Sequence, residues 1–296
     1  MVGLQHKYDI ASEDESVRKN GIRFLRTIAE SVGEIGGGPV GGIIYGSWRD
    51  RLPDVDVDRG PYVERSVSSM KEAIKSAEDN NVTFNMEVVN RFEHYIMNTC
   101  EEAIDYIKLV ESTHAKIMLD TFHVNIEEDF FGEAILQAGD LLGHFHIGEN
   151  NRMPPGYGHT PWTEIGAALR KIDYRGYVVM EPFMKPGGEV GRDIKVFRDL
   201  GVGMDLDEEA RKADLRLDVR EGALAVPLLG VADRLAKRAL RAAHAASSTR
   251  RCPRPRRSSQ PPPARHPPPN WPCLLYTSDA DDEGLGVDLG GRRIIK

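Results

Sequence analysis

The sequence predicts an α/β fold in which a parallel sheet is built from alternating strands and helices. Short apolar runs recur along residues 1–213, and segments in which apolar residues return every three to five positions separate them. Strands that alternate with helices in this way form βαβ units, whose strands run parallel. At 296 residues the chain is long enough for one large domain of this class or two small ones.

The first elements follow from apolar spacing and from helix-start signals. A helix is predicted over 12–32, with Ser12 as its N-cap and Glu15 completing a capping box. The run GGIIY at 41–45 predicts a buried strand. Apolar residues that share one face predict a second helix over 66–79.

Four more strands follow, with a helix in each interval. The strands are predicted over 82–87, 116–120, 143–147 and 177–181. The intervening helices are predicted over 100–110, 131–138 and 162–172. Each of these strands ends on or near a side chain that can bind a metal ion, namely Glu87, Asp120, His146 and Glu181.

These four side chains lie roughly 30 residues apart, the length of one βαβ repeat. In a (β/α)8 barrel all strands end at the same face, where active sites lie. The spacing therefore predicts that the four side chains converge on one point. Taken singly, each has a simpler interpretation, because a strand-end carboxylate often caps the next helix or is solvated, and His146 could be a core residue.

Three carboxylates and one imidazole form a hard ligand set. Such a set favours Mn²⁺, Co²⁺ or Mg²⁺ over a structural zinc. Without a cation the carboxylates would repel one another and raise each other's pKa. The sequence therefore predicts a divalent metal as cofactor.

Composition narrows the remaining classes. No apolar run of about 20 residues is present, so no membrane span is predicted, and the opening MVGLQHKYDI lacks the pattern of a secretory signal. The net charge of −7 argues against nucleic acid as a partner. Residues 1–213 hold a single cysteine, Cys100, which fits a reducing compartment and predicts a cytoplasmic location.

The composition changes after residue 213. Half of the 18 prolines lie between Pro253 and Pro272, among arginines and alanines. We interpret 214–272 as an out-of-frame, disordered Arg/Pro/Ala-rich tail and 273–296 as an adapter-derived artefact, because CLLYTSDA and VDLGGRRII resemble translated sequencing-adapter DNA. The alternatives for the tail are a basic arm for nucleic acid and a polyproline ligand.

Five segments carry longer motifs: FNMEVVNRFEHY, IMLDTFHVNIEED, GHFHIGENNR, PWTEIGAAL and VVMEPF. Together they resemble the ketose 3-epimerase family, which includes D-tagatose and D-psicose (allulose) 3-epimerases and belongs to the xylose isomerase-like TIM barrels. The resemblance runs from about Gly3 to about Ala213. It implies a partial (β/α)8 barrel that retains about five of eight strands and is truncated at its N-terminus. We therefore expect the chain as written to fold poorly. The resemblance also implies that the intact parent is a homodimer or homotetramer.

The resemblance also implies the site and the reaction. Glu87 and Glu181 match metal ligands that are also the catalytic acid and base, and Asp120 and His146 match the other two ligands. The substrate-binding positions are matched by Glu93, His123, Arg152 and Trp48.

The implied activity of the intact parent is metal-dependent epimerisation of free ketohexoses at C3, of the D-fructose/D-psicose or D-tagatose/D-sorbose type, by proton abstraction through an enediolate. We expect the truncated chain to be impaired in this activity. The alternatives are a related isomerase, of the aldose–ketose, hydroxypyruvate isomerase or inosose dehydratase type, and a non-catalytic fragment. Arg152 could also be a surface charge, and Glu93 could pair with a helix neighbour. The sequence leaves the preferred ketose and the choice among the three metals open.

Overall fold

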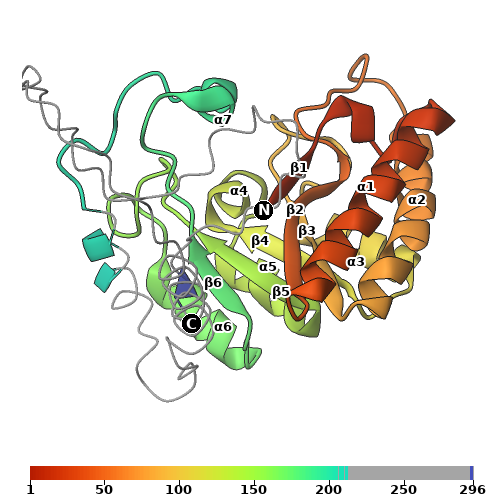
Figure 1. The fold of residues 1–296 in the computed structure, drawn as a ribbon. Helices are drawn as coiled ribbons and strands as arrows, with labels where there is room; N and C mark the ends of the chain where they lie inside the picture. Colours follow the sequence, from red (N-terminus) through yellow and green to blue (C-terminus); the bar gives the residue numbers. More distant parts are fainter. Residues whose placement is uncertain (206, 210, 213–293, 296) are drawn as a thin grey trace, which may run out of the picture. The chain divides into compact units, whose positions relative to one another are not determined.

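The computed structural model describes residues 1–205, 207–209, 211–212 and 294–295. Its centre is a sheet in which strands neighbouring in sequence are neighbours in space (Figure 1). The six parallel strands are β1 (Val2–Leu4), β2 (Gly38–Ser47), β3 (Val82–Val88), β4 (Ala115–Asp120), β5 (Leu142–Ile147) and β6 (Tyr177–Met180). A two-residue strand, β7 (Ile294–Ile295), pairs antiparallel with β6. The predicted α/β class with a partial barrel-type sheet is confirmed.

All five predicted strands are present, with bounds that shift by a few residues. The predicted number of about five parallel strands is nevertheless one short, because β1 precedes them. This strand is only three residues long, which is too short to show an alternating pattern. Among the described strands the sheet runs in linear order from β1 to β7, with β1 at one end.

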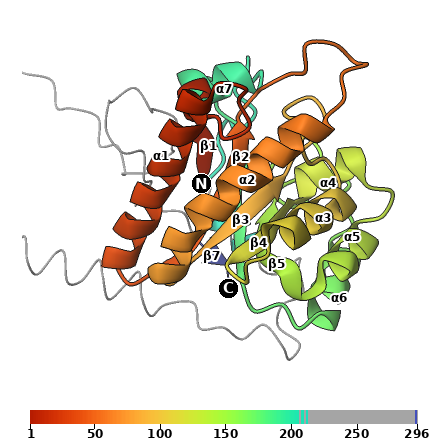
Figure 2. The same ribbon diagram turned by 90° about the vertical axis from the view of Figure 1, so that its right-hand side faces the viewer.

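Five helices form a layer over one face of the sheet, in the order in which they occur along the chain (Figure 2). They are α1 (Glu15–Glu34), α2 (Gly60–Asp79), α3 (Cys100–Val110), α5 (Phe131–Ala138) and α6 (Trp162–Lys171). The chain also forms two shorter helices, α4 (Thr121–Glu127) and α7 (Gly188–Asp193), and two 3₁₀ turns at His6–Tyr8 and Gly139–Leu141. The helix predictions for α3 and α5 are confirmed at both ends.

The start of α1 differs from the prediction. Its N-cap is Asp14, whose carboxylate accepts a hydrogen bond from the backbone N–H of Ser16 at 2.7 Å. Ser12 instead accepts from the N–H of Asp14 at 3.2 Å, so the predicted cap fixes the turn before the helix. Both side chains are good caps, and the one nearer the first helical N–H groups takes the role. The predicted second helix also begins too late, because α2 starts at Gly60 with a proline in its first turn.

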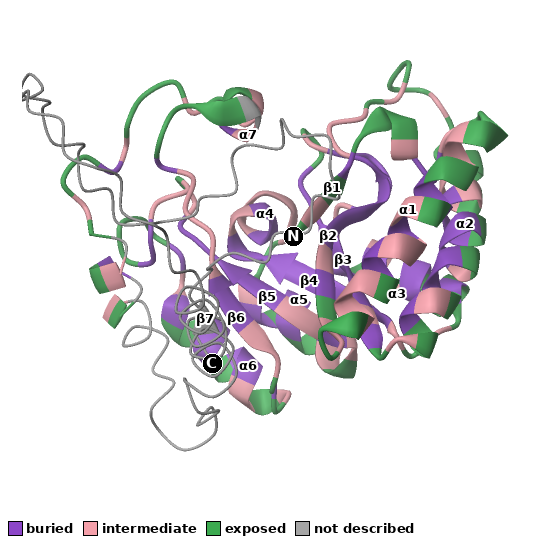
Figure 3. Cartoon of the chain, in the orientation of Figure 1, coloured by how far each residue is buried: buried purple, intermediate pink, exposed green. Residues whose placement is uncertain are grey.

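The core lies between the sheet and the helix layer. Leu25 of α1, Met70 of α2 and Phe84 of β3 are among its fully buried side chains. Figure 3 shows that β3 and β4 are buried along almost their whole length, while exposed residues line the outer sides of α1 and α2. Because β3 is buried on both faces, its polar residues on the face away from Phe84 need partners of their own.

The predicted tail, 214–272, lies outside the described residues. So does the predicted adapter-derived segment, 273–296, except for Ile294 and Ile295 of β7. Among the helices of the described part, none is both long and apolar enough to cross a membrane.

Candidate metal centre

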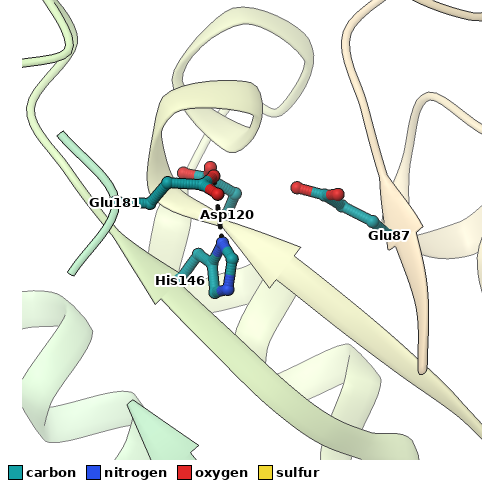
Figure 4. A group of neighbouring side chains, drawn as sticks. All are labelled: Glu87, Asp120, His146 and Glu181. Carbon is teal, nitrogen blue, oxygen red and sulfur yellow. Dashed lines mark hydrogen bonds and ion pairs between the residues drawn. The ribbon is translucent and has the colours of Figure 1, made fainter. Parts of the chain in front are cut away.

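Four side chains predicted to converge do so at the carboxyl ends of neighbouring strands. They are Glu87 of β3, Asp120 at the end of β4, His146 of β5 and Glu181 directly after β6. One ligand atom from each lies within 4.8 Å of the other three. Figure 4 shows the carboxylates of Glu87 and Glu181 approaching from opposite sides of the group.

The register of the sheet explains this convergence. Asp120 lies directly opposite His146 across the β4–β5 pair. Glu87 pairs with Met118, two residues before Asp120, and His146 pairs with Val179, two residues before Glu181. Side chains two apart on a strand share a face, so all four residues point to the face of the sheet away from the helix layer.

The four side chains are withdrawn from solvent. Glu87, Asp120 and His146 are at most 3% exposed, and the side chain of Glu181 is 10% exposed. His146 Nδ1 lies 3.1 Å from Glu181 Oε2. One oxygen of Asp120 caps α4 by accepting from the N–H of Phe122 at 2.8 Å. The capping interpretation of Asp120 is therefore correct, and Asp120 still offers one ligand atom to the group.

The negative charges of the three clustered carboxylates disfavour one another. Burial, followed by the charges of Glu181, Asp120 and Glu93, raises the pKa of Glu87 well above its ordinary value, while Arg152 opposes the rise. Three buried carboxylates beside one imidazole nitrogen form the hard, oxygen-rich set that divalent cations such as Mn²⁺, Co²⁺ and Mg²⁺ prefer. A cation among these oxygens replaces repulsion by attraction. The residues present therefore fit a divalent metal.

Arg152 lies at the rim of this cluster and contacts two carboxylates. Its Nη1 is 3.2 Å from Asp120 Oδ2, and its Nη2 is 3.6 Å from Glu93 Oε1. The guanidinium also lies over the rings of Phe122 and Phe183, at 3.7 Å and 5.0 Å from their centroids. With its side chain only 11% exposed, Arg152 is not the surface charge that the sequence left as an alternative.

Glu93 connects Arg152 to Trp48. Its Oε2 accepts from the indole N–H of Trp48 at 3.1 Å, and its Oε1 accepts from the amide of Asn90 at 3.3 Å. Its contacts are thus with Trp48, Asn90 and Arg152 and not with a helix neighbour. Glu93, Trp48 and Arg152, which were predicted to share one site, are brought together.

His123 completes the predicted set on the side of Glu87. The ring is 3% exposed, and its Nε2 lies 3.9 Å from Glu87 Oε1. Burial, reinforced by the charge of Arg152, lowers the pKa of His123 to about 3. The imidazole is therefore neutral at physiological pH.

Sequence patterns did not identify three residues around the site. Asn90 bridges His123 and Glu93, Phe183 stacks on Arg152, and Glu149 anchors the loop that carries Arg152. All three follow a strand by a few residues, at the same face as the predicted ligands. That position is a usable signal, but their roles depend on contacts with side chains from other repeats.

Comparisons with known proteins identify the family of this chain. Residues 1–200 match the family described as xylose isomerase-like TIM barrel. The D-psicose 3-epimerase of Ruminiclostridium cellulolyticum is 46% identical over 215 residues, which cover 71% of this chain and 73% of that protein. The D-psicose 3-epimerase of Agrobacterium fabrum is 44% identical, over 72% of this chain and 74% of its own. The crystal structure of D-psicose 3-epimerase with D-tagatose from Clostridium cellulolyticum H10 matches with a TM-score of 0.68 and 43% identity, and covers 75% of this chain and 76% of that one.

Proposed function

Because the chain belongs to the ketose 3-epimerases of the xylose isomerase-like TIM barrel family, a family of isomerases, we propose that it epimerises free ketohexoses at C3. The substrate pairs are of the D-fructose/D-psicose or D-tagatose/D-sorbose type. The reaction removes the proton on C3, α to the ketone, and returns a proton to the opposite face of the same carbon. No redox partner is needed, because the bond broken and the bond formed are both C–H.

Glu87 and Glu181 are the acid and base in this proposal. Their carboxylates face each other across the cluster, so a sugar held between them presents one face of C3 to each (Figure 4). One carboxylate takes the proton, which leaves an enediolate, and the other delivers a proton from the opposite side. Inversion at C3 follows from this opposed placement.

Glu87, Asp120, His146 and Glu181 would hold the metal. A bound divalent cation would supply Lewis-acid stabilisation of the negative charge that develops on the substrate oxygens. Mn²⁺ is the metal we propose, with Co²⁺ and Mg²⁺ as alternatives. The donor set supports this proposal, because three carboxylates and one imidazole are ligands that these ions share.

The polar groups around the cluster would fix the sugar. Arg152 and the neutral His123 offer N–H donors for the carbonyl and hydroxyl oxygens, and Glu93 accepts from a hydroxyl. Trp48 would form one wall, held in place by its hydrogen bond to Glu93. We place the reaction in the cytoplasm, where the buried free thiol of Cys100 would stay reduced.

The opposed carboxylates of Glu87 and Glu181 in one metal-binding cluster are the observation on which the proposal depends. The test is to incubate the full chain with D-fructose and Mn²⁺ in D₂O and to separate the sugars by chromatography. We expect D-psicose that carries deuterium at C3, and turnover by this chain would contradict the expectation from the sequence that it folds poorly. An aldose product would instead identify an aldose–ketose isomerase, and turnover of hydroxypyruvate or an inosose alone would identify one of the other related activities.

Variants connect the activity to the residues. Glu87→Gln and Glu181→Gln should each lower kcat by roughly 100-fold or more, because each removes one proton-transfer group. Glu133→Gln changes a glutamate in the first turn of α5, within the helix layer, and is the matched control. Equal activity in the wild type and both site variants would exclude the proposed roles of Glu87 and Glu181.

A further inference from the structure

Asn90 is a buried side chain between two of the proposed sugar-binding residues. It lies two residues after β3 and is 2% exposed. Its amide nitrogen is 2.7 Å from His123 Nδ1 and 3.3 Å from Glu93 Oε1. Its backbone N–H also donates to His123 Nδ1, at 3.2 Å.

The hydrogen bonds assign the orientation of this amide. The side-chain oxygen of Asn90 accepts from the backbone N–H of Phe92 at 3.0 Å, and a backbone N–H can only donate. The NH₂ group must then face His123 and Glu93, and the carboxylate of Glu93 is an acceptor that suits it. Both N–H bonds and the oxygen of Asn90 are thus in use.

The same contacts assign the tautomer of His123. Its Nδ1 faces two donors, the backbone N–H and the side-chain NH₂ of Asn90, and neither group can accept a hydrogen bond. Nδ1 must therefore carry the lone pair, and the single proton of the neutral ring lies on Nε2. Nε2 lies 3.9 Å from Oε1 of Glu87, so it is on the side of the ring where the substrate of the proposed reaction would bind.

We propose that Asn90 is a positioning residue that holds His123 as the Nε2–H tautomer and fixes Glu93 at the same time. The inference rests on the proposed function, because it identifies the residue that keeps His123 a hydrogen-bond donor toward the substrate. With the proton on Nδ1 instead, the ring would present a lone pair to the site. A sugar carbonyl or enediolate oxygen would then meet an acceptor where it needs a donor.

Two substitutions separate the tautomer from general support of the loop. Asn90→Asp places an acceptor opposite Nδ1, so the proton of His123 should move to that nitrogen. Asn90→Ala removes the side-chain bonds but keeps the backbone donor, so the tautomer should stay. The matched control is Asn98→Ala, because Asn98 donates to the carbonyls of Val89 and His94 in the same loop without touching His123 or Glu93.

The experiment combines ¹⁵N NMR of the histidine rings with epimerisation kinetics on the full chain. The His123 signals are assigned by difference from a His123→Asn variant, and thermal unfolding checks that each variant folds. We expect an Nε2–H signal for His123 in the wild type, in Asn90→Ala and in Asn98→Ala, and an Nδ1–H signal in Asn90→Asp. For kcat/KM we expect a loss of roughly 10-fold in Asn90→Ala, roughly 100-fold in Asn90→Asp, and little change in Asn98→Ala.

Two results would overturn the proposal. One is an Nδ1–H signal for His123 in the wild type. The other is a loss of activity in Asn98→Ala equal to that in Asn90→Ala, which would reduce Asn90 to a structural residue of the loop. The NMR measurement requires no turnover, so a wild type that shows the Nε2–H tautomer but converts no ketose would refute the proposed function and leave the assignment of Asn90 standing.

Discussion

Arg152 Nη1 lies 3.2 Å from Oδ2 of Asp120, a carboxylate whose other oxygen caps α4. The contact places a fixed positive charge beside a proposed metal ligand, within a side-chain environment that is almost closed to solvent. A guanidinium can hold this position while it stacks on Phe122, because it is planar and weakly hydrated. Arg152 can therefore orient Asp120 and still offer N–H groups to a sugar.

Replacing Arg152 by lysine should weaken sugar binding more than metal binding. Lysine keeps the charge but loses the planar fork and the stacking on Phe122. We expect KM for D-fructose to rise roughly 10-fold, since lost hydrogen bonds to charged groups cost about 1.5–3 kcal/mol. Mn²⁺ affinity, measured by calorimetry, should stay within a factor of a few. Arg91→Lys, which changes an exposed partner of Glu127, is the control. An unchanged KM in Arg152→Lys would contradict the prediction.

Glu87→Gln should raise the stability of the protein without metal and lower it, relative to the wild type, when Mn²⁺ is bound. Without metal, burial and the neighbouring carboxylates disfavour the ionised Glu87, so the neutral glutamine should raise the melting temperature measured with a chelator. With Mn²⁺ at about 100 times its Kd, the wild type should gain about 2.7 kcal/mol, and the variant should gain much less. Calorimetry under both conditions checks the sign change. A variant less stable than the wild type in both would show that the cluster tolerates its charges without a cation.

The repeat of the sequence predicted most of the fold, because each βαβ unit carries its own apolar pattern. It also predicted the convergence of the four candidate metal ligands, since Glu87, Asp120, His146 and Glu181 occupy one position in successive repeats. The repeat did not predict elements that are very short, or contacts that form between two βαβ units. β1 has three residues, and α4 starts directly after Asp120, with no turn residue that would mark its start in the sequence.

The supporting residues were missed for a related reason. Asn90 acts through His123, which belongs to the next repeat, and Phe183 acts through Arg152. Such contacts form only when the sheet brings neighbouring strand ends together, so no spacing within one segment encodes them. The N-cap of α1 shows the same limit on a small scale, because Ser12 and Asp14 are both good caps and only the backbone path selects Asp14.

Glu149 should control the loop that presents Arg152. Its buried carboxylate accepts from the backbone N–H groups of Gly156 and Thr160 and from the indole of Trp162 at 2.8 Å. Burial raises the pKa of Glu149, but these hydrogen bonds outweigh burial and leave the pKa below its ordinary value. Arg152 lies in the same loop at a φ of 62°, a left-handed conformation that costs a residue with a side chain about 1–2 kcal/mol, and its backbone N–H donates to the carbonyl of Glu149 at 2.9 Å.

Replacing Glu149 by glutamine should therefore lower both stability and sugar affinity. The amide can accept fewer of the three hydrogen bonds, so we expect a loss of about 1–3 kcal/mol in the free energy of unfolding. KM should rise as Arg152 leaves its position. Glu128→Gln, which changes a carboxylate that accepts from the N–H of Cys100 in another loop, should lower stability without raising KM. Urea unfolding and steady-state kinetics measure the two effects, and a Glu149→Gln variant with wild-type KM would refute the link to Arg152.

His94 is a buried histidine that the proposed reaction does not use. Its ring lies between Tyr45 and Tyr95, with centroids at 5.1 Å and 4.8 Å, and is 1% exposed. Its Nδ1 accepts from the N–H of Ile96 at 3.1 Å, so the proton of the neutral ring is on Nε2. Within the described part of the chain Nε2 has no hydrogen-bond partner. A protonated ring would therefore bury a charge that the carboxylate of Asp50 compensates only in part.

This burial should make the protein less stable in acid, with a sign that follows from the two pKa values. Burial lowers the pKa of folded His94 to about 4, against 6.5 for an unperturbed histidine. Below pH 6.5 the unfolded chain thus binds a proton on His94, whereas the folded protein does not bind it until the pH falls to about 4. The free energy of unfolding therefore decreases as the pH falls through this window. Between pH 7 and pH 5 the wild type should lose about 2 kcal/mol more than His94→Gln, measured by urea unfolding. The comparison cancels the similar contribution of His123, which both proteins retain. If the free energy of unfolding depended on pH in the same way in both proteins, the pKa of His94 in the folded protein would not be lowered and the prediction would be wrong.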